Sequence, residues 1–149
     1  MSDMNKSLLV FNGIIKENGK QYRDAAKLLG ISDCVFWILY SLRETKENLT
    51  QKEIGDTAFM PPQTINSALK KLEAGGYVEL RNDSDKRSKQ VYLTEKGDIL
   101  AQKTVDKVIA IEMRAVNGMT EEEQLVFLKL FQKYTDLLKI HIYALKKEP

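Results

Sequence analysis

The residues between positions 61 and 72 are arranged so that one side of a helix could read a nucleic acid. At about 100° per residue, apolar and polar side chains separate onto opposite faces. The apolar face consists of Ile65, Ala68, Leu69 and Leu72. The polar face consists of Gln63, Asn66, Ser67 and Lys70, with Thr64 and Lys71 at its edge. Amides and hydroxyls can donate to and accept from base edges, and lysine can meet phosphate or guanine, so this face could contact DNA.

A second charged group lies between positions 81 and 89. Its cations are Arg81, Lys86, Arg87 and Lys89 and its anions are Asp83 and Asp85, so its surplus of +2 equals that of the whole chain. An arginine on a loop tip can enter the minor groove, where the potential is most negative. We expect Arg87 to make that contact and Asp85 to brace its guanidinium by a bidentate pair. Lys86 and Lys89 complete the predicted DNA-contacting set.

Sequence signals for helices and strands place these two groups. Thr50 and Glu53 fit a capping box that starts a short helix, and Pro61-Pro62 ends that helix and starts the next. Gly75-Gly76 ends the helix with the polar face. The period then changes to two over 77–81 and 90–94, which predicts a β-hairpin whose tip is the charged group. Helix, turn, helix and hairpin make a winged helix-turn-helix, whose second helix lies in the DNA major groove.

Longer helices are expected on both sides of this segment. Apolar residues recur at helical spacing over about 5–29, and an almost wholly apolar, buried helix follows an N-cap at Ser32. Thr94 is expected to cap a fifth helix reaching about Val116, and Thr120 with Glu123 a final helix reaching about Lys146. The predicted fold class is mainly α, a single domain over 1–149 with a winged helix-turn-helix at about 31–96 and a small β-hairpin wing.

The final helix has more apolar surface than one chain needs. Its apolar band consists of Phe127, Leu130, Phe131, Tyr134, Leu137, Leu138, His141, Ile142 and Leu145. The band is wider than the stripe of roughly 100° by which a surface helix packs on its own core. We therefore expect a second copy of the chain to cover the remainder by two-fold symmetry.

Composition argues against several other classes of protein. The 149 residues fit one domain, and one Cys with one His allows neither an intramolecular disulfide nor a zinc site within one chain. No signal peptide is visible and no apolar run reaches the roughly 20 residues of a membrane span, so we expect a reduced, cytoplasmic location without a membrane partner. The sequence indicates no cofactor, and it has no nucleophile–base pair or phosphate-binding glycine loop typical of an enzyme.

The segment from Leu49 to Gly97 resembles the multiple-antibiotic-resistance regulator (MarR) family. The motifs that carry the resemblance are Leu49-Thr50-Gln51, Glu53-Ile54, Thr64-Ile65-Asn66, Leu69-Lys70-Lys71-Leu72-Glu73, Gly76-Tyr77-Val78, Asp85-Lys86-Arg87 and Leu93-Thr94-Glu95-Lys96-Gly97. The resemblance implies a homodimeric transcriptional regulator, in most members a repressor of a palindromic operator in double-stranded DNA. It implies dimerisation helices at about 5–29 and 97–146, and in many members a small phenolic or other effector that releases the DNA.

Three alternatives stay open at the level of sequence. Tyr22, Trp37 and Tyr40 could line an effector cleft, although core packing is the preferred interpretation. Cys34 could act as a redox switch, although its mostly apolar helix favours a buried thiol, and the oxidant-sensing branch of the family carries its cysteine near the start of the first helix. The whole chain could also be a winged-helix module that binds proteins and has no DNA site.

Overall fold

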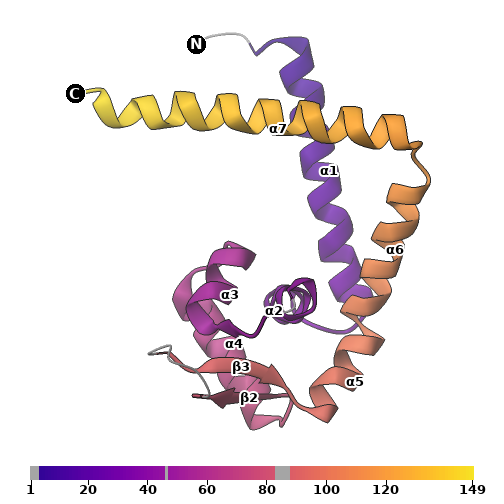
Figure 1. Ribbon diagram of the computed structural model, residues 1–149, viewed down its shortest axis with the longest axis vertical. Coiled ribbons are helices and arrows are strands. Elements are labelled where there is room, and N and C mark those ends of the chain that lie inside the picture. Colours follow the sequence, from indigo (N-terminus) through magenta and orange to yellow (C-terminus); the bar gives the residue numbers. More distant parts are fainter. Residues whose placement is uncertain (1–3, 46, 83–87) are drawn as a thin grey trace. The chain divides into compact units, whose positions relative to one another are not determined.

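The computed structural model describes residues 4–45, 47–82 and 88–149. The chain divides into two compact units, Met1–Ile109 and Ala110–Pro149. Its elements are α1 (Lys6–Leu28), α2 (Asp33–Glu44), β1 (Leu49–Thr50), α3 (Gln51–Ala58), α4 (Pro62–Ala74), β2 (Val78–Arg81), β3 (Gln90–Leu93), α5 (Glu95–Lys103), α6 (Val105–Asn117), α7 (Glu121–Ala144) and the 3-10 turn η1 (Leu145–Lys147) (Figure 1). The mainly α class and the winged helix-turn-helix at its centre are as predicted from the sequence.

Helices begin where polar caps predicted them. The Ser32 hydroxyl accepts the third N–H of α2 at 3.1 Å. Both capping boxes form: the Thr50 hydroxyl accepts the Glu53 N–H at 3.2 Å, and the Thr120 hydroxyl accepts the Glu123 N–H at 3.1 Å. Each glutamate in turn accepts the N–H of its threonine. These local bonds satisfy donors that have no partner within the helix, which is why short polar motifs fix the helix starts.

The helix with the polar face, α4, also has the predicted limits. Pro62 is its first residue, at a position where a missing N–H costs nothing. At its other end Gly76 has a φ of 78°, and the Tyr77 N–H reaches back to the Leu72 carbonyl at 2.8 Å. For the chain to turn back on the helix end in this way, residue 76 needs a positive φ, which glycine adopts without steric cost.

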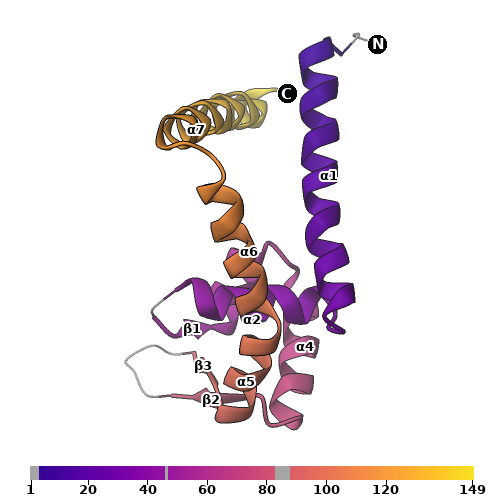
Figure 2. The same ribbon diagram turned by 90° about the vertical axis from the view of Figure 1, so that its right-hand side faces the viewer.

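The sheet has one more strand than the sequence predicted. The hairpin strands β2 and β3 pair antiparallel, with Val78 opposite Leu93. The two-residue strand β1 pairs with the other edge of β3, with Leu49 opposite Val91, so the strand order is β1-β3-β2 (Figure 2). Two residues are too few to show an alternating pattern, so β1 could not be predicted from the sequence. It is recognised as a strand only because it pairs with β3.

The first unit is built around α2, which contributes to two groups of buried side chains. One group joins α2 to α3, α4 and the sheet and consists of Ile38, Ile54, Ile65, Ala68, Leu69, Leu72, Val78 and Val91. The other joins α2 to α1, α5 and α6 and consists of Ala26, Phe36, Leu39, Ala101, Val105 and Val108. A helix that packs on two sides must be apolar nearly all round, as the sequence of α2 predicts.

The prediction of one continuous fifth helix up to Val116 is wrong. The helix breaks at Thr104, whose φ and ψ are −123° and −93°, and continues as α6. The Thr104 hydroxyl donates to the Leu100 carbonyl at 2.7 Å, and its N–H donates to Ala101 at 3.2 Å. Such local bonds compete with the regular helical pattern. Because apolar residues recur at helical spacing on both sides, the sequence gives no sign of the break.

A single arginine spans this break. Arg43 of α2 bonds both carboxylate oxygens of Asp106, through Nε at 2.9 Å and Nη2 at 3.0 Å, while its Nη1 lies 2.7 Å from the Asp98 carboxylate. Asp98 belongs to α5 and Asp106 to α6, so one guanidinium joins both sides of the break to α2. Paired bonds between a guanidinium and a carboxylate have a fixed geometry, so the contact fixes the start of α6.

The Leu93–Gly97 motif joins three elements at one point. The Thr94 hydroxyl caps α5 and donates to the turn 75–76 at the end of α4. Lys96 donates to the same turn at 2.7 Å and lies 4.4 Å over the centre of the Tyr77 ring. A Cβ on Gly97 would overlap the carbonyl group of Tyr77. The motif therefore allows α5 to pack directly against the backbone that leads into β2.

In the second unit, the remaining residues of α6 lead to α7. No residue of α7 is buried, and its large apolar side chains have exposed fractions of 39–69%. Phe127 and Phe131 stack with their ring centres 5.8 Å apart. Among the described residues no single helix is both long and apolar enough to cross a membrane; α1 and α2, bent by 99° between them, reach that length and composition only as a pair.

Replacing Gly97 by alanine is expected to destabilise the protein by about 1–3 kcal/mol, because a Cβ must displace either α5 or the backbone at Tyr77. Urea unfolding followed by circular dichroism measures the change. Gly55 is a matched control, since its added Cβ would be at ordinary distances of 3.6 and 3.7 Å from its neighbours. Gly55→Ala is expected to stabilise α3 by about 0.5–1 kcal/mol. Equal effects of the two substitutions would contradict the role given to Gly97.

Candidate nucleic-acid interface

The α4 helix has one buried and one solvent-facing side. Ile65, Ala68, Leu69 and Leu72 are buried. The residues predicted to read DNA lie opposite: Gln63, Thr64, Ser67, Lys70 and Lys71 are exposed and Asn66 is half-buried. No acidic residue lies between Gln63 and Lys71, and no side chain caps the helix N-terminus. An uncapped N-terminus favours an anion, and the polar face beside it offers donors and acceptors for base edges.

The predicted hairpin contacts fall only partly within the described residues. Asp85, Lys86 and Arg87 lie outside them, whereas Lys89 is exposed just before β3. Arg81, the other cation of this stretch, makes contacts within the sheet. Its guanidinium lies 2.8 Å from the Glu79 carboxylate and 4.4 Å over the centre of the Tyr92 ring. These contacts hold Arg81 along β2.

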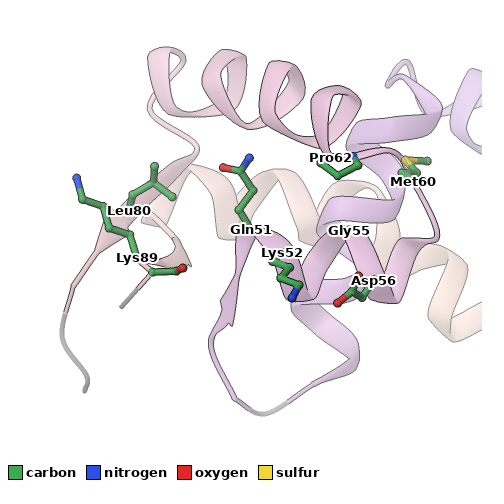
Figure 3. A pocket seen from close by; sticks show the side chains of 9 residues that line it. Gln51, Lys52, Gly55, Asp56, Met60, Pro62, Leu80 and Lys89 are labelled. Atoms are coloured by element: carbon green, nitrogen blue, oxygen red, sulfur yellow. The ribbon is translucent and has the colours of Figure 1, made fainter. Parts of the chain in front are cut away.

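A cavity of about 560 Å³ adds residues that the sequence analysis missed (Figure 3). Lys52 and Gln51, at the start of α3, lie on one side of it, and Lys89 lies on another. Its apolar wall includes Met60 and Pro62 in the turn before α4. The first two positions of a capped helix could have indicated Gln51 and Lys52, because helix N-termini favour phosphate. No sequence pattern predicted that Lys89 would line the same cavity.

Tyr22, Trp37 and Tyr40 are brought together by α1 and α2. The Trp37 ring centre lies 5.3 Å from that of Tyr22 and 5.3 Å from that of Tyr40. Phe36 completes the group, with its ring edge-on to Trp37 at 4.9 Å. All three predicted residues are half-buried against the core that joins α1, α2, α5 and α6. Packing of large rings against this core accounts for their positions.

Cys34 lies at the contact between α2 and α4. Its Sγ lies 3.7 Å from the Thr64 carbonyl oxygen, and the side chain is half-buried. Burial raises the pKa of the Cys34 thiol above its ordinary value, and the Asp33 carboxylate adds to the effect. Oxidant-sensing cysteines need a lowered pKa, because the thiolate is the form that reacts. The surroundings of Cys34 instead raise its pKa and so reduce the fraction of thiolate.

These elements define a winged helix-turn-helix with a polar recognition face, the architecture of a DNA-binding protein. Residues 23–88 match the MarR family. The uncharacterized HTH-type transcriptional regulator YwoH of Bacillus subtilis is 27% identical over 135 residues, which are 90% of this chain and 98% of that protein. The regulator SarZ of Staphylococcus epidermidis is 36% identical over 83 residues, so the match spans only 55% of that relative.

Solved structures agree with the sequence comparison. A MarR family regulator from Silicibacter pomeroyi superposes with a TM-score of 0.67 at 28% identity, over 87% of each chain. MepR of S. aureus, in a complex with DNA, shares the fold with a TM-score of 0.69 at 21% identity, over 90% of this chain and 96% of that one. The chain therefore matches the MarR family over residues 23–88, and its fold and its named relatives are those of winged-helix transcriptional regulators.

The raised pKa of Cys34 predicts a slow reaction with iodoacetamide at pH 7.5, because little thiolate is present. The rate is expected to rise with pH through a midpoint above the value of about 8.5 for an ordinary cysteine. Mass spectrometry of the alkylated protein measures the rate, and the chain unfolded in urea provides the ordinary rate. A folded protein that reacts faster than the unfolded chain at pH 7.5 would reopen the redox alternative.

Proposed function

We propose that the chain is a homodimeric repressor that binds a palindromic operator in double-stranded DNA and releases it when a small effector binds. The observation that carries the proposal is the acid-free, exposed face of α4 opposite a fully packed apolar face. Because the buried face fixes the orientation of α4 about its own axis, the same polar side chains would face DNA in every complex. The likeness in fold to MepR, solved in a complex with DNA, supports the same docking mode.

The DNA contacts are divided between two grooves. Gln63, Thr64, Asn66, Ser67 and Lys70 read base edges in the major groove, and Lys71 lies at the edge of this face. Arg87 enters the minor groove with Asp85 bracing it, and Lys86 and Lys89 approach the backbone. Amides form paired hydrogen bonds with adenine, so Asn66 is assigned a reading role, and Lys71, at the edge of the face, is assigned to charge neutralisation.

The dimer is proposed to form through the helices at about 5–29 and 97–146 of a single MarR-type domain. The apolar side chains of α7 support it, since an apolar surface of this extent normally has a partner. The N-terminal half of α1 adds Leu9, Val10, Ile14 and Ile15, with exposed fractions of 46–59%. A two-fold dimer would present two α4 helices to two halves of a palindrome.

The effector is proposed to be a small phenolic or similar aromatic molecule. Tyr22, Trp37 and Tyr40 are half-buried, so part of each ring remains available for stacking. They belong to α1 and α2, and α2 also packs against α4. An effector that bound more tightly to one spacing of the two α4 helices would shift the dimer toward that spacing and change its fit to DNA.

Operator binding can be tested with two substitutions in α4. Asn66→Ala is expected to relax the preference for one base pair by about 1–3 kcal/mol, because a paired hydrogen bond to a base is lost. Lys71→Ala is expected to weaken binding to all sequences and to lower the slope of log Kd against log salt by about 1. Fluorescence anisotropy with the chain's own upstream region and single-base variants measures both. Equal loss on every sequence for Asn66→Ala would contradict its reading role.

The same titration separates the regulator from the alternative without a DNA site. The wild-type protein is expected to bind its upstream region with an affinity that falls steeply as salt rises. A purified protein without salt-sensitive affinity would favour a winged-helix module that binds other proteins.

The dimer predicts a solution mass of twice 17.1 kDa, measurable by light scattering. Leu138→Glu is expected to yield a monomer that no longer binds operator DNA, because a charge would be buried in the apolar interface. Lys139→Glu is the matched control: it adds negative charge at the next position, outside the apolar band, and should leave the mass unchanged. A dimeric Leu138→Glu variant would contradict the proposed interface.

A further inference from the structure

Phe59 stands out in the turn between α3 and α4. Among the residues that the structure describes, it is the only non-glycine residue with a positive φ, at 53° with a ψ of 41°. Its side chain is also 94% exposed. Bulky residues rarely adopt this left-handed conformation, because the Cβ crowds the backbone. The chain therefore accepts a backbone cost at Phe59 without gaining a buried side chain in return.

The turn itself does not require a phenylalanine. The Phe59 N–H donates to the Gly55 carbonyl to end α3, and the Met60 N–H reaches the same carbonyl at 3.2 Å. Both bonds use backbone atoms only, and glycine at position 59 would form them with less strain. A residue that opposes local stability and lies in solvent is a candidate for a binding role.

The position of Phe59 relative to α4 indicates what it could contact. Phe59 lies four residues before Gln63, a distance of at most about 14 Å along an extended chain, and Pro61-Pro62 limits the freedom between them. In the docking mode of the proposed function, the start of α4 enters a major groove about 12 Å wide. The walls of that groove are the sugar–phosphate strands, so the turn must lie beside one of them.

We propose that Phe59 is a DNA-contacting residue whose ring packs against a deoxyribose at the edge of the major groove. The inference rests on the proposed function and adds a positioning contact to it. The ring offers neither charge nor a hydrogen bond, so phosphate is an unsuitable partner, and the sugar is the apolar part of the backbone. Lys52 and Lys89, on the cavity next to this turn, provide the charge for the neighbouring phosphates.

The test compares stability and DNA affinity in the same variant. Phe59→Gly is expected to keep or raise the midpoint of thermal unfolding, because glycine tolerates a positive φ. The same variant is expected to raise Kd for the labelled upstream region about tenfold, as expected when a partly buried ring is lost. The slope of log Kd against log salt should not change, because phenylalanine neutralises no phosphate.

Matched variants isolate the ring. Phe59→Asn also tolerates the backbone conformation and should lose affinity like glycine, whereas Phe59→Tyr keeps the ring and should stay within about twofold of wild type. A duplex with uracil in place of thymine removes the thymine methyl groups and leaves every deoxyribose in place.

Each outcome decides the proposal. Phe59→Gly binding as tightly as the wild type would overturn it, as would a lowered unfolding midpoint or a changed salt slope. A loss of affinity that disappears on the uracil duplex would assign Phe59 to base reading and overturn the deoxyribose contact. If the wild type itself shows no salt-sensitive DNA binding, the proposed function fails and the Phe59 contact fails with it.

Discussion

The close approach of α5 to the backbone at Tyr77 is the constraint on which the winged helix-turn-helix depends. Gly97 leaves the space for it, and Thr94 and Lys96 bond the turn 75–76 that ends α4. One small contact therefore positions the recognition helix, the hairpin and the helix that leads out of the winged domain. Because backbone atoms meet closely at Gly97 and two side chains bond the turn, the polar face of α4 keeps a defined rotation.

The helix α2 connects the rest of the first unit in a similar way. Its side chains belong to both buried groups of the first unit, so α4 and α1 pack on the same helix. Arg43 extends the connection to both sides of the break at Thr104. A change at the aromatic rings of α1 and α2 would therefore reach α4 through a single packed helix. Cores packed to the density of crystals transmit such displacements because they contain little free volume.

Most of the first unit could be predicted because its signals are local. Caps, prolines and glycines mark where α2, α3 and α4 begin or end, and the 3.6-residue period identifies the buried face of α4. Two features of the fold were missed because no local signal marks them. The strand β1 forms only by pairing with β3, and the helix breaks at Thr104 although the apolar spacing continues past that residue. The place of Lys89 on the cavity and the conformation of Phe59 were likewise not evident, since spatial neighbours or backbone dihedrals define them. Gln51 and Lys52 did have a local signal, the capped start of α3, which the sequence analysis did not use. Asp85, Lys86 and Arg87 remain predictions, because they lie outside the described residues.

The two prolines before α4 have a thermodynamic consequence for recognition. Each pyrrolidine ring fixes its own φ, and Pro62 also restricts the backbone of Pro61. The turn that leads into the recognition helix thus loses most of its conformational freedom when the chain folds rather than when it meets a partner. Less entropy remains to be lost on complex formation, so a larger part of each contact's free energy appears as affinity. In this chain a preorganised turn takes the place that a polar capping side chain occupies at the starts of α2, α3, α5 and α7.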